Sequence, residues 1–149
     1  MTKRSHRLAV SLGLGYFVAL ACIVFWPSPV DRPVDHSLFE TIGWVRSLGI
    51  PPWLFSYNVI EFTANILMFA PFGIIVALRM PRRLWWVAVM AGALASAAVE
   101  LSQGLFLAQR DASWSDIVAN TAGAAVGALA VLGARARLRR KQEPAGTSV

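Results

Sequence analysis

Four long apolar runs set the limits of what this chain can fold into. They cover residues 8–26, 59–78, 84–107 and 117–134. A helix needs about 20 apolar residues to cross a bilayer, so each run is long enough to span a membrane. Only 15% of the 149 residues are charged, whereas a soluble domain carries about 25%. We therefore predict an all-α membrane protein in which residues 1–149 form a single domain with four transmembrane helices.

The first apolar run has the features of an uncleaved membrane helix. A signal peptide has a shorter apolar core and ends at small residues, whereas this run continues to Phe25 and Trp26. Cys22 could be a lipoprotein cysteine, but the apolar residues continue past it. Because Cys22 is the only cysteine, an intramolecular disulfide is excluded, and no set of Cys and His has the spacing of zinc ligands. We expect neither a metal nor a cofactor.

A short helix is predicted in the loop after the first run. Ser37 and Glu40 have the spacing of a capping box, which marks a helix start. Gly49 suits the turn that ends a helix, and Pro51 prevents its continuation. This helix is too short to span a membrane, so we expect it to lie in the interface of the first outer loop. The alternative is a plain surface helix packed on the bundle.

The positions of Lys and Arg predict the orientation of the chain. With four spans, the N-terminus, residues 79–83 and the tail lie on one side, and they carry most of the 14 Lys and Arg residues. Positive residues stay in the cytoplasm, so both termini are predicted to be cytoplasmic. Residues 135–149 then form a basic cytoplasmic tail, which we expect to be flexible. Because topology accounts for these charges, we expect membrane lipids and no nucleic acid as partners.

Polar residues gather at the outer ends of the last three runs. Each of these runs has one carboxylate near that end, and an amide follows three or four residues later on the same helix face. Arg110 lies in the short loop between the third and fourth runs. Ionisable residues at membrane depth are costly and usually serve a function. The predicted functional cluster, a candidate ligand-binding site, consists of Glu61, Asn65, Glu100, Gln103, Arg110, Asp116 and Asn120.

Small residues at helical spacing predict how the spans pack. Gly92 and Ser96 lie four residues apart in the third run, and Gly123 and Gly127 do so in the fourth. Small side chains at this spacing let helix backbones approach closely. We therefore expect the third and fourth helices to pack closely, with Glu100 facing the fourth.

Three segments around the polar residues carry a family resemblance. They are Glu61–Gly73, Glu100–Gln103 and Arg110–Gly127. In these segments the chain resembles the VanZ-like family of small bacterial membrane proteins. The family usually has Pro-Gly before the arginine, where this chain has Ala108-Gln109. The founding member is associated with resistance to teicoplanin-type glycopeptide antibiotics. The resemblance therefore implies a protein of the bacterial cell envelope, in the plasma membrane, and it implies no particular reaction.

Three interpretations of the polar cluster follow. In the first, the cluster binds an envelope lipid, a cell-wall precursor or a lipid-linked glycan, with Arg110 on an anionic group, and so contributes to resistance. In the second, the carboxylates act on a lipid-linked phosphate, either by holding Mg²⁺ or Mn²⁺ or as acid and base. In the third, the polar groups only join helices.

We expect binding rather than catalysis. No His lies near the cluster, and the nearby Ser102, Ser113 and Ser115 have no adjacent base, so the pattern does not support a hydrolytic triad. A proton-coupled transporter is less favoured still, because four short spans leave little room for a transport path.

Overall fold

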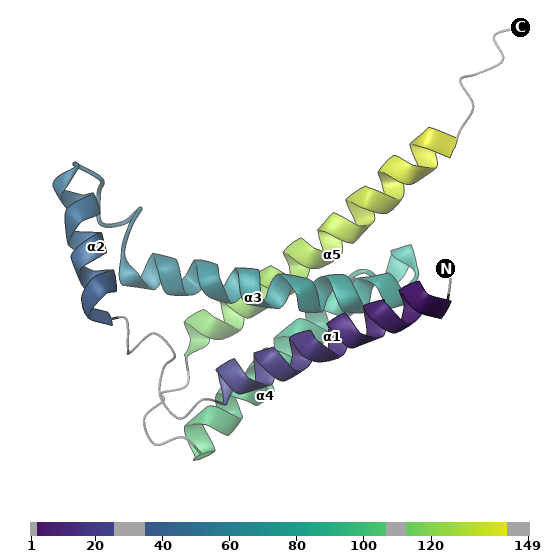
Figure 1. The fold of residues 1–149 in the computed structure, drawn as a ribbon, viewed down its shortest axis with the longest axis horizontal. Helices are drawn as coiled ribbons and strands as arrows, with labels where there is room; N and C mark the ends of the chain where they lie inside the picture. Colours follow the sequence, from purple (N-terminus) through teal and green to yellow (C-terminus); the bar gives the residue numbers. More distant parts are fainter. Residues whose placement is uncertain (1–2, 26–34, 107–112, 143–149) are drawn as a thin grey trace, which may run out of the picture. The chain divides into compact units, whose positions relative to one another are not determined.

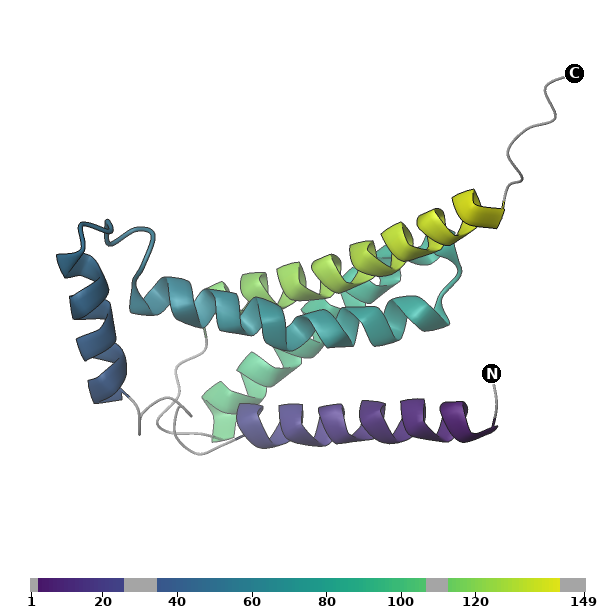
Figure 2. The same ribbon diagram turned by 45° about the horizontal axis from the view of Figure 1, so that its top comes forward.

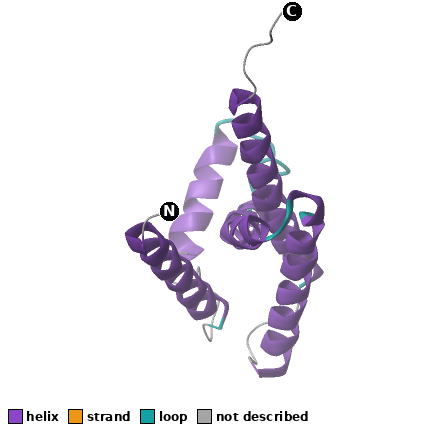
Figure 3. Cartoon of the chain, turned by 90° about the vertical axis from the view of Figure 1, so that its right-hand side faces the viewer, coloured by secondary structure: helices purple, strands orange, loops and turns teal. Residues whose placement is uncertain are grey.

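The computed structural model describes residues 3–25, 35–106 and 113–142. Its elements are α1 (Lys3–Val24), α2 (Asp35–Ser47), α3 (Tyr57–Arg79), the 3₁₀ turn η2 (Arg82–Leu84), α4 (Trp86–Phe106) and α5 (Trp114–Gln142), as labelled in Figure 1. Figure 3 shows that the described part of the chain contains helices and loops and no strand. The predicted all-α fold is confirmed.

Four segments are long and apolar enough to cross a membrane. They are Arg7–Val24, Tyr57–Arg79, Arg82–Phe106 and Trp114–Lys141. Many of their large apolar side chains point outward, among them those of α1 and α4, as expected for helices surrounded by lipid. The prediction of four transmembrane helices is therefore confirmed.

The fourth helix is longer than the sequence predicted. The apolar run ends at Ala134, but α5 continues to Gln142. The added residues are mainly Arg, Ala, Leu and Lys, which are strong helix formers, and cations are favoured at a helix C-terminus. The first part of the predicted tail is therefore helical. Residues 143–149 of that tail lie outside the described residues.

The short helix predicted after the first span is α2. It begins at Asp35, so Ser37 lies inside its first turn and not at the helix cap as predicted. Its one buried apolar residue among those described is Ile42. Gly49 has a φ of 85°, and its N–H donates to the carbonyl of Arg46 at 3.0 Å. The predicted end of the helix is confirmed, because this left-handed conformation suits glycine.

The chain forms two compact units, and each is described by itself. The first unit comprises Met1–Thr63 and Ala97–Trp114, and the second comprises Ala64–Ser96 and Ser115–Val149. Helices α3, α4 and α5 each contribute residues to both units. The prediction of one domain stays a prediction.

The second unit is built on close contacts between helix backbones. A Cβ added to Gly123 would meet the carbonyl of Ile66, and one added to Gly73 would meet the backbone of Ala124. The two glycines thus let α3 and α5 touch along their backbones, and Figure 2 shows these helices side by side. Gly127 belongs to the same contact.

Around Pro71, helix α3 remains continuous. Proline frees the carbonyl four residues earlier and usually bends a membrane helix. A Cβ added to Gly127 of α5 would meet the carbonyl of Ala70 and, at 2.8 Å, the backbone nitrogen of Ile74. Glycine at 127 therefore allows α5 to pack directly against the proline turn.

The small residues of α4 face α5 within this unit. A Cβ added to Gly92 would meet the side chain of Ala124, which also packs on Gly73 of α3. One turn away, the core contains Ala88 and Ala128, both fully buried. The predicted close packing of the third and fourth helices is confirmed for this part of the chain.

Candidate functional site

The most enclosed polar pair in the second unit is Asn120 with Ser96. Asn120 Nδ2 donates to Ser96 Oγ at 2.9 Å, and the residues are 4% and 0% exposed. Within the described part of the chain, Asn120 Oδ1 is buried and has no hydrogen-bond partner. Exchanging the amide O and N would only move the missing bond to the nitrogen, because a single hydroxyl faces the group. A buried polar atom without a partner costs about 1–3 kcal/mol.

The helical positions next to this pair are occupied by small residues and one aromatic ring. Steps of four residues along α5 and α4 lead from the contact of Ala124 with Gly92 to Asn120 and Ser96. The same step along α3 leads from Gly73 to Phe69, which is fully buried. The pair therefore lies one helical turn beyond the close contact of Ala124 with Gly73 and Gly92.

Two further members of the predicted cluster belong to the second unit. Asp116 is half-buried in the first turn of α5, one turn before Asn120. Its charge is favoured there, because the N-terminal end of a helix carries a partial positive charge. Asn65 is half-buried on α3, one turn before Phe69.

In the first unit, Glu100 is a buried acid that contacts the start of another helix. Its side chain is 4% exposed, and Oε2 accepts the backbone N–H of Ser113 at 2.7 Å. Ser113 directly precedes α5, so the carboxylate satisfies a donor at that helix start. Hydrogen bonds to an ionised acceptor are about twice as strong as neutral ones.

Gln103 makes a similar connection to α1. It is also 4% exposed, and Nε2 donates to the carbonyl of Val24 at 2.7 Å. Val24 is the last residue of α1, where carbonyls have no partner within the helix. Glu100 and Gln103 thus both join α4 to backbone at the end of another segment.

The predicted cluster is therefore divided between the units. Glu61, Glu100 and Gln103 belong to the first, and Asn65, Asp116 and Asn120 belong to the second. Glu61 is exposed near the start of α3. Arg110 lies outside the described residues. The meeting of all seven residues at one site stays a prediction.

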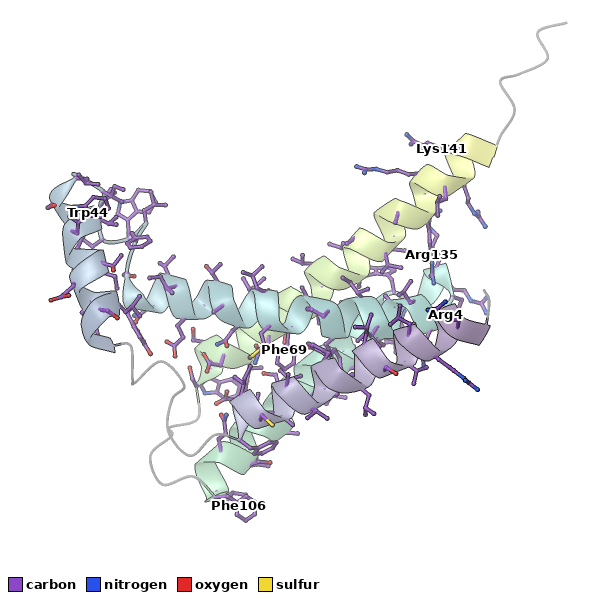
Figure 4. All side chains as sticks on the ribbon, in the orientation of Figure 1. Arg4, Trp44, Phe69, Phe106, Arg135 and Lys141 are labelled. Carbon is purple, nitrogen blue, oxygen red and sulfur yellow. The ribbon has the colours of Figure 1, made fainter. Side chains whose placement is uncertain are left out.

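Sequence reasoning missed two polar residues. Ser96 was identified only as a small residue, but its hydroxyl accepts the bond from Asn120. Arg135 was assigned to a flexible tail, but Nη1 donates to the carbonyl of Met80 at 2.9 Å and Nη2 to that of Leu78 at 3.0 Å. Figure 4 labels Arg135 near the end of α3. Its spacing of four residues from buried Val131 could have indicated an inward position.

The described residues give no support to a metal-dependent site. Among them, no group of three or more His, Cys, Asp or Glu residues could hold a metal ion. Carboxylate clusters are the usual ligands for Mg²⁺ or Mn²⁺. The enzyme interpretation through a bound metal therefore gains nothing from this part of the chain.

Comparison with known proteins identifies a family for this chain. A family model described as VanZ/LLP1 matches residues 14–135, well over half of the chain. Comparisons with curated proteins and with solved structures found no match. The matched range includes the polar residues described above, the apolar parts of the last three spans and part of the first span. The chain is therefore a membrane protein that belongs to the VanZ/LLP1 family.

Proposed function

We propose that this protein binds an envelope lipid or lipid-linked precursor at the outer face of the bacterial plasma membrane. The polar cluster predicted from the sequence would be the binding site, and binding would change the access of teicoplanin-type antibiotics to their target. Family membership supports a role in the cell envelope, since the family resemblance implies a protein of the bacterial cell envelope and its founding member is associated with this resistance.

Asn120 carries this proposal. Its Oδ1 is buried without a partner in the described residues, one helical turn from Asp116. Both groups accept hydrogen bonds when Asp116 is ionised. A ligand with several donors, such as sugar hydroxyls, amines or peptide N–H groups, would supply the hydrogen bond that Asn120 Oδ1 lacks. Envelope precursors carry these groups, whereas a bare phosphate offers mainly acceptors.

The proposal also includes the orientation of the chain. With both termini in the cytoplasm, the starts of α3 and α5 lie at the outer surface, where an envelope precursor is accessible. Reporter fusions after residue 142 and in the loop between α2 and α3 test this. We expect a cytoplasmic reporter to be active only at the C-terminal fusion, and the opposite pattern would contradict the orientation.

Antibiotic tolerance in a teicoplanin-sensitive bacterial host tests the function. We expect the intact gene to raise tolerance, and Asp116→Asn to abolish the gain while the amount of folded protein in the membrane is unchanged. Thr121→Val is the matched control, because the Thr121 hydroxyl bonds the carbonyl of Ile117 at 2.7 Å within its own helix. It should keep full tolerance. Equal tolerance of Asp116→Asn and the intact protein would contradict a role for this site.

A structural role is the second candidate, and two contacts favour it for part of the cluster. Glu100 and Gln103 each bond a backbone group at the end of another segment. If they only join helices, Glu100→Gln should lower tolerance and membrane yield together. If Glu100 also contacts the ligand, tolerance should fall while yield is maintained.

A further inference from the structure

A second charged region lies at the other end of α5. Two segments of the second unit supply it, the end of α3 with η2 and the last two turns of α5. All of its side chains are exposed, and Figure 4 labels Lys141 at its outer limit. We call it the basic end, and its cations are Arg79, Arg82, Arg83, Arg137, Arg139, Arg140 and Lys141.

Arg135 holds the two segments of the basic end together. Its guanidinium donates from α5 to two carbonyls of the last turn and end of α3, those of Leu78 at 3.0 Å and Met80 at 2.9 Å. These carbonyls lack partners in the helix, and a planar guanidinium can reach both at once. The last turns of α5 therefore start where α3 ends, and the cations of both segments lie in one region.

The length of α5 places the basic end beyond the apolar layer. The helix has 29 residues, which corresponds to about 43 Å at 1.5 Å per residue. The hydrocarbon core of a bilayer is about 30 Å thick, or about 20 residues of helix. Counted from Trp114, the core then ends close to Ala134. The cations from Arg137 onward lie in the headgroup layer.

Nothing in the described chain neutralises these charges. Residues 79–84 and 135–141 contain no Asp or Glu. Within the described residues, the structure records no ion pair for any cation of the basic end. Like charges in one region repel, so the folded arrangement favours an external anion. Phosphate groups of lipids lie at the depth reached by the last turns of α5.

We propose that the basic end is a binding site for anionic phospholipids, with Arg135 as the residue that positions its two segments. Both the ligand and the surface differ from those of the proposed function. The cations would contact lipid phosphates, and guanidinium groups suit this because they donate two parallel hydrogen bonds. A cation near an anionic membrane contributes about 1 kcal/mol, which corresponds to about fivefold in affinity.

Native mass spectrometry of the full chain in detergent tests the site, with phosphatidylglycerol and phosphatidylcholine as probes. We expect the chain to prefer phosphatidylglycerol, and the double variant R139Q/R140Q to bind it about thirtyfold more weakly. The matched control R4Q/R7Q removes two exposed cations from α1 and should change binding less than threefold. Equal losses in both double variants would contradict a defined site.

Arg135→Lys separates the shape of the site from its charge. The variant keeps the positive charge but loses the planar fork that reaches both carbonyls. We expect phosphatidylglycerol to bind about fivefold more weakly to this variant, although the net charge is unchanged. Unchanged binding would overturn the positioning role of Arg135. Inorganic phosphate should compete poorly, and competition as strong as that of the lipid would overturn the assignment to a phospholipid.

Discussion

Helices α1 and α5 are nearly equal in mean hydropathy and very different in packing. The most apolar 18 residues of each span have values of 2.0 and 1.8, yet 6% of these residues are buried in the first span and 39% in the second. In α1, Leu12 and Leu14 are about two-thirds exposed. In α5, Ala124 and Ala128 are fully buried.

The difference shows that residue size at helical spacing decides which helix packs. Both helices contain glycines, but Gly13 and Gly15 of α1 have nothing within 4 Å of an added Cβ. Gly123 and Gly127 of α5 lie against the backbone of α3. Without a hydrophobic driving force between helices in lipid, such close contacts supply much of the attraction. Hydropathy therefore identifies a span, and the spacing of small residues identifies a packed face.

The largest expected effect comes from filling one of these glycine contacts. Gly127→Leu should destabilise the protein by about 3 kcal/mol or more, because the new side chain meets the backbone of α3. Thermal unfolding of the purified protein in detergent measures the change. Gly13→Leu is the control, since its Cβ meets no neighbour, and its melting temperature should stay within error. Similar losses in both variants would remove the contrast between α1 and α5.

A smaller effect is expected at the end of α5. Arg135→Ala removes two charge-assisted hydrogen bonds to the end of α3, which we expect to cost about 1.5–3 kcal/mol. Arg4→Ala removes an exposed arginine from α1 and should cost almost nothing. Denaturant unfolding of both variants checks the prediction. A loss from Arg4→Ala as large as that from Arg135→Ala would contradict it.

The buried pair of Asn120 and Ser96 should contribute less. A double-mutant cycle of Asn120→Leu and Ser96→Ala should give a coupling energy of about 0.6 kcal/mol, the average for hydrogen bonds between membrane helices. Unfolding of the two single variants and the double variant measures it. A coupling energy of zero would mean that the two side chains do not interact.

An effect of similar size is expected at the end of α1. Gln103→Leu removes the donor to the carbonyl of Val24, at a cost of about 0.6 kcal/mol. Cys22, the only cysteine, is exposed two residues earlier and reports on this end of the helix. Maleimide labelling of Cys22 should become about threefold faster in the variant. No change in the labelling rate would indicate that this bond does not hold α1 in place.

Most of the fold was predictable because apolar runs define membrane helices. The predicted span 59–78 agrees with α3, Tyr57–Arg79, to within two residues at each end. The small residues of α4 face α5, as predicted. The partner of Gly123 and Gly127 was not predictable, since small residues permit a contact without specifying the other helix. The length of α5 was missed because charged residues ended the apolar run before the helix ended.

The candidate site was less predictable than the fold. Three polar positions that helical spacing singled out, Glu100, Gln103 and Asn120, are buried. It could not give their partners, because Val24 and Ser113 contribute backbone atoms that any residue type would supply. The gathering of the whole cluster, with Glu61 and Arg110, remains a prediction.

Lipid that co-purifies with the protein tests the central claim most directly. The claim is that the polar ends of the packed helices bind a donor-rich envelope lipid, in contrast to the lipid-exposed α1. We expect mass spectrometry to identify a lipid with sugar hydroxyl, amine or peptide groups bound to the intact protein. It should be lost from Asp116→Asn and retained by Thr121→Val. Only bulk phospholipids, in the same proportions in both variants, would contradict the proposal.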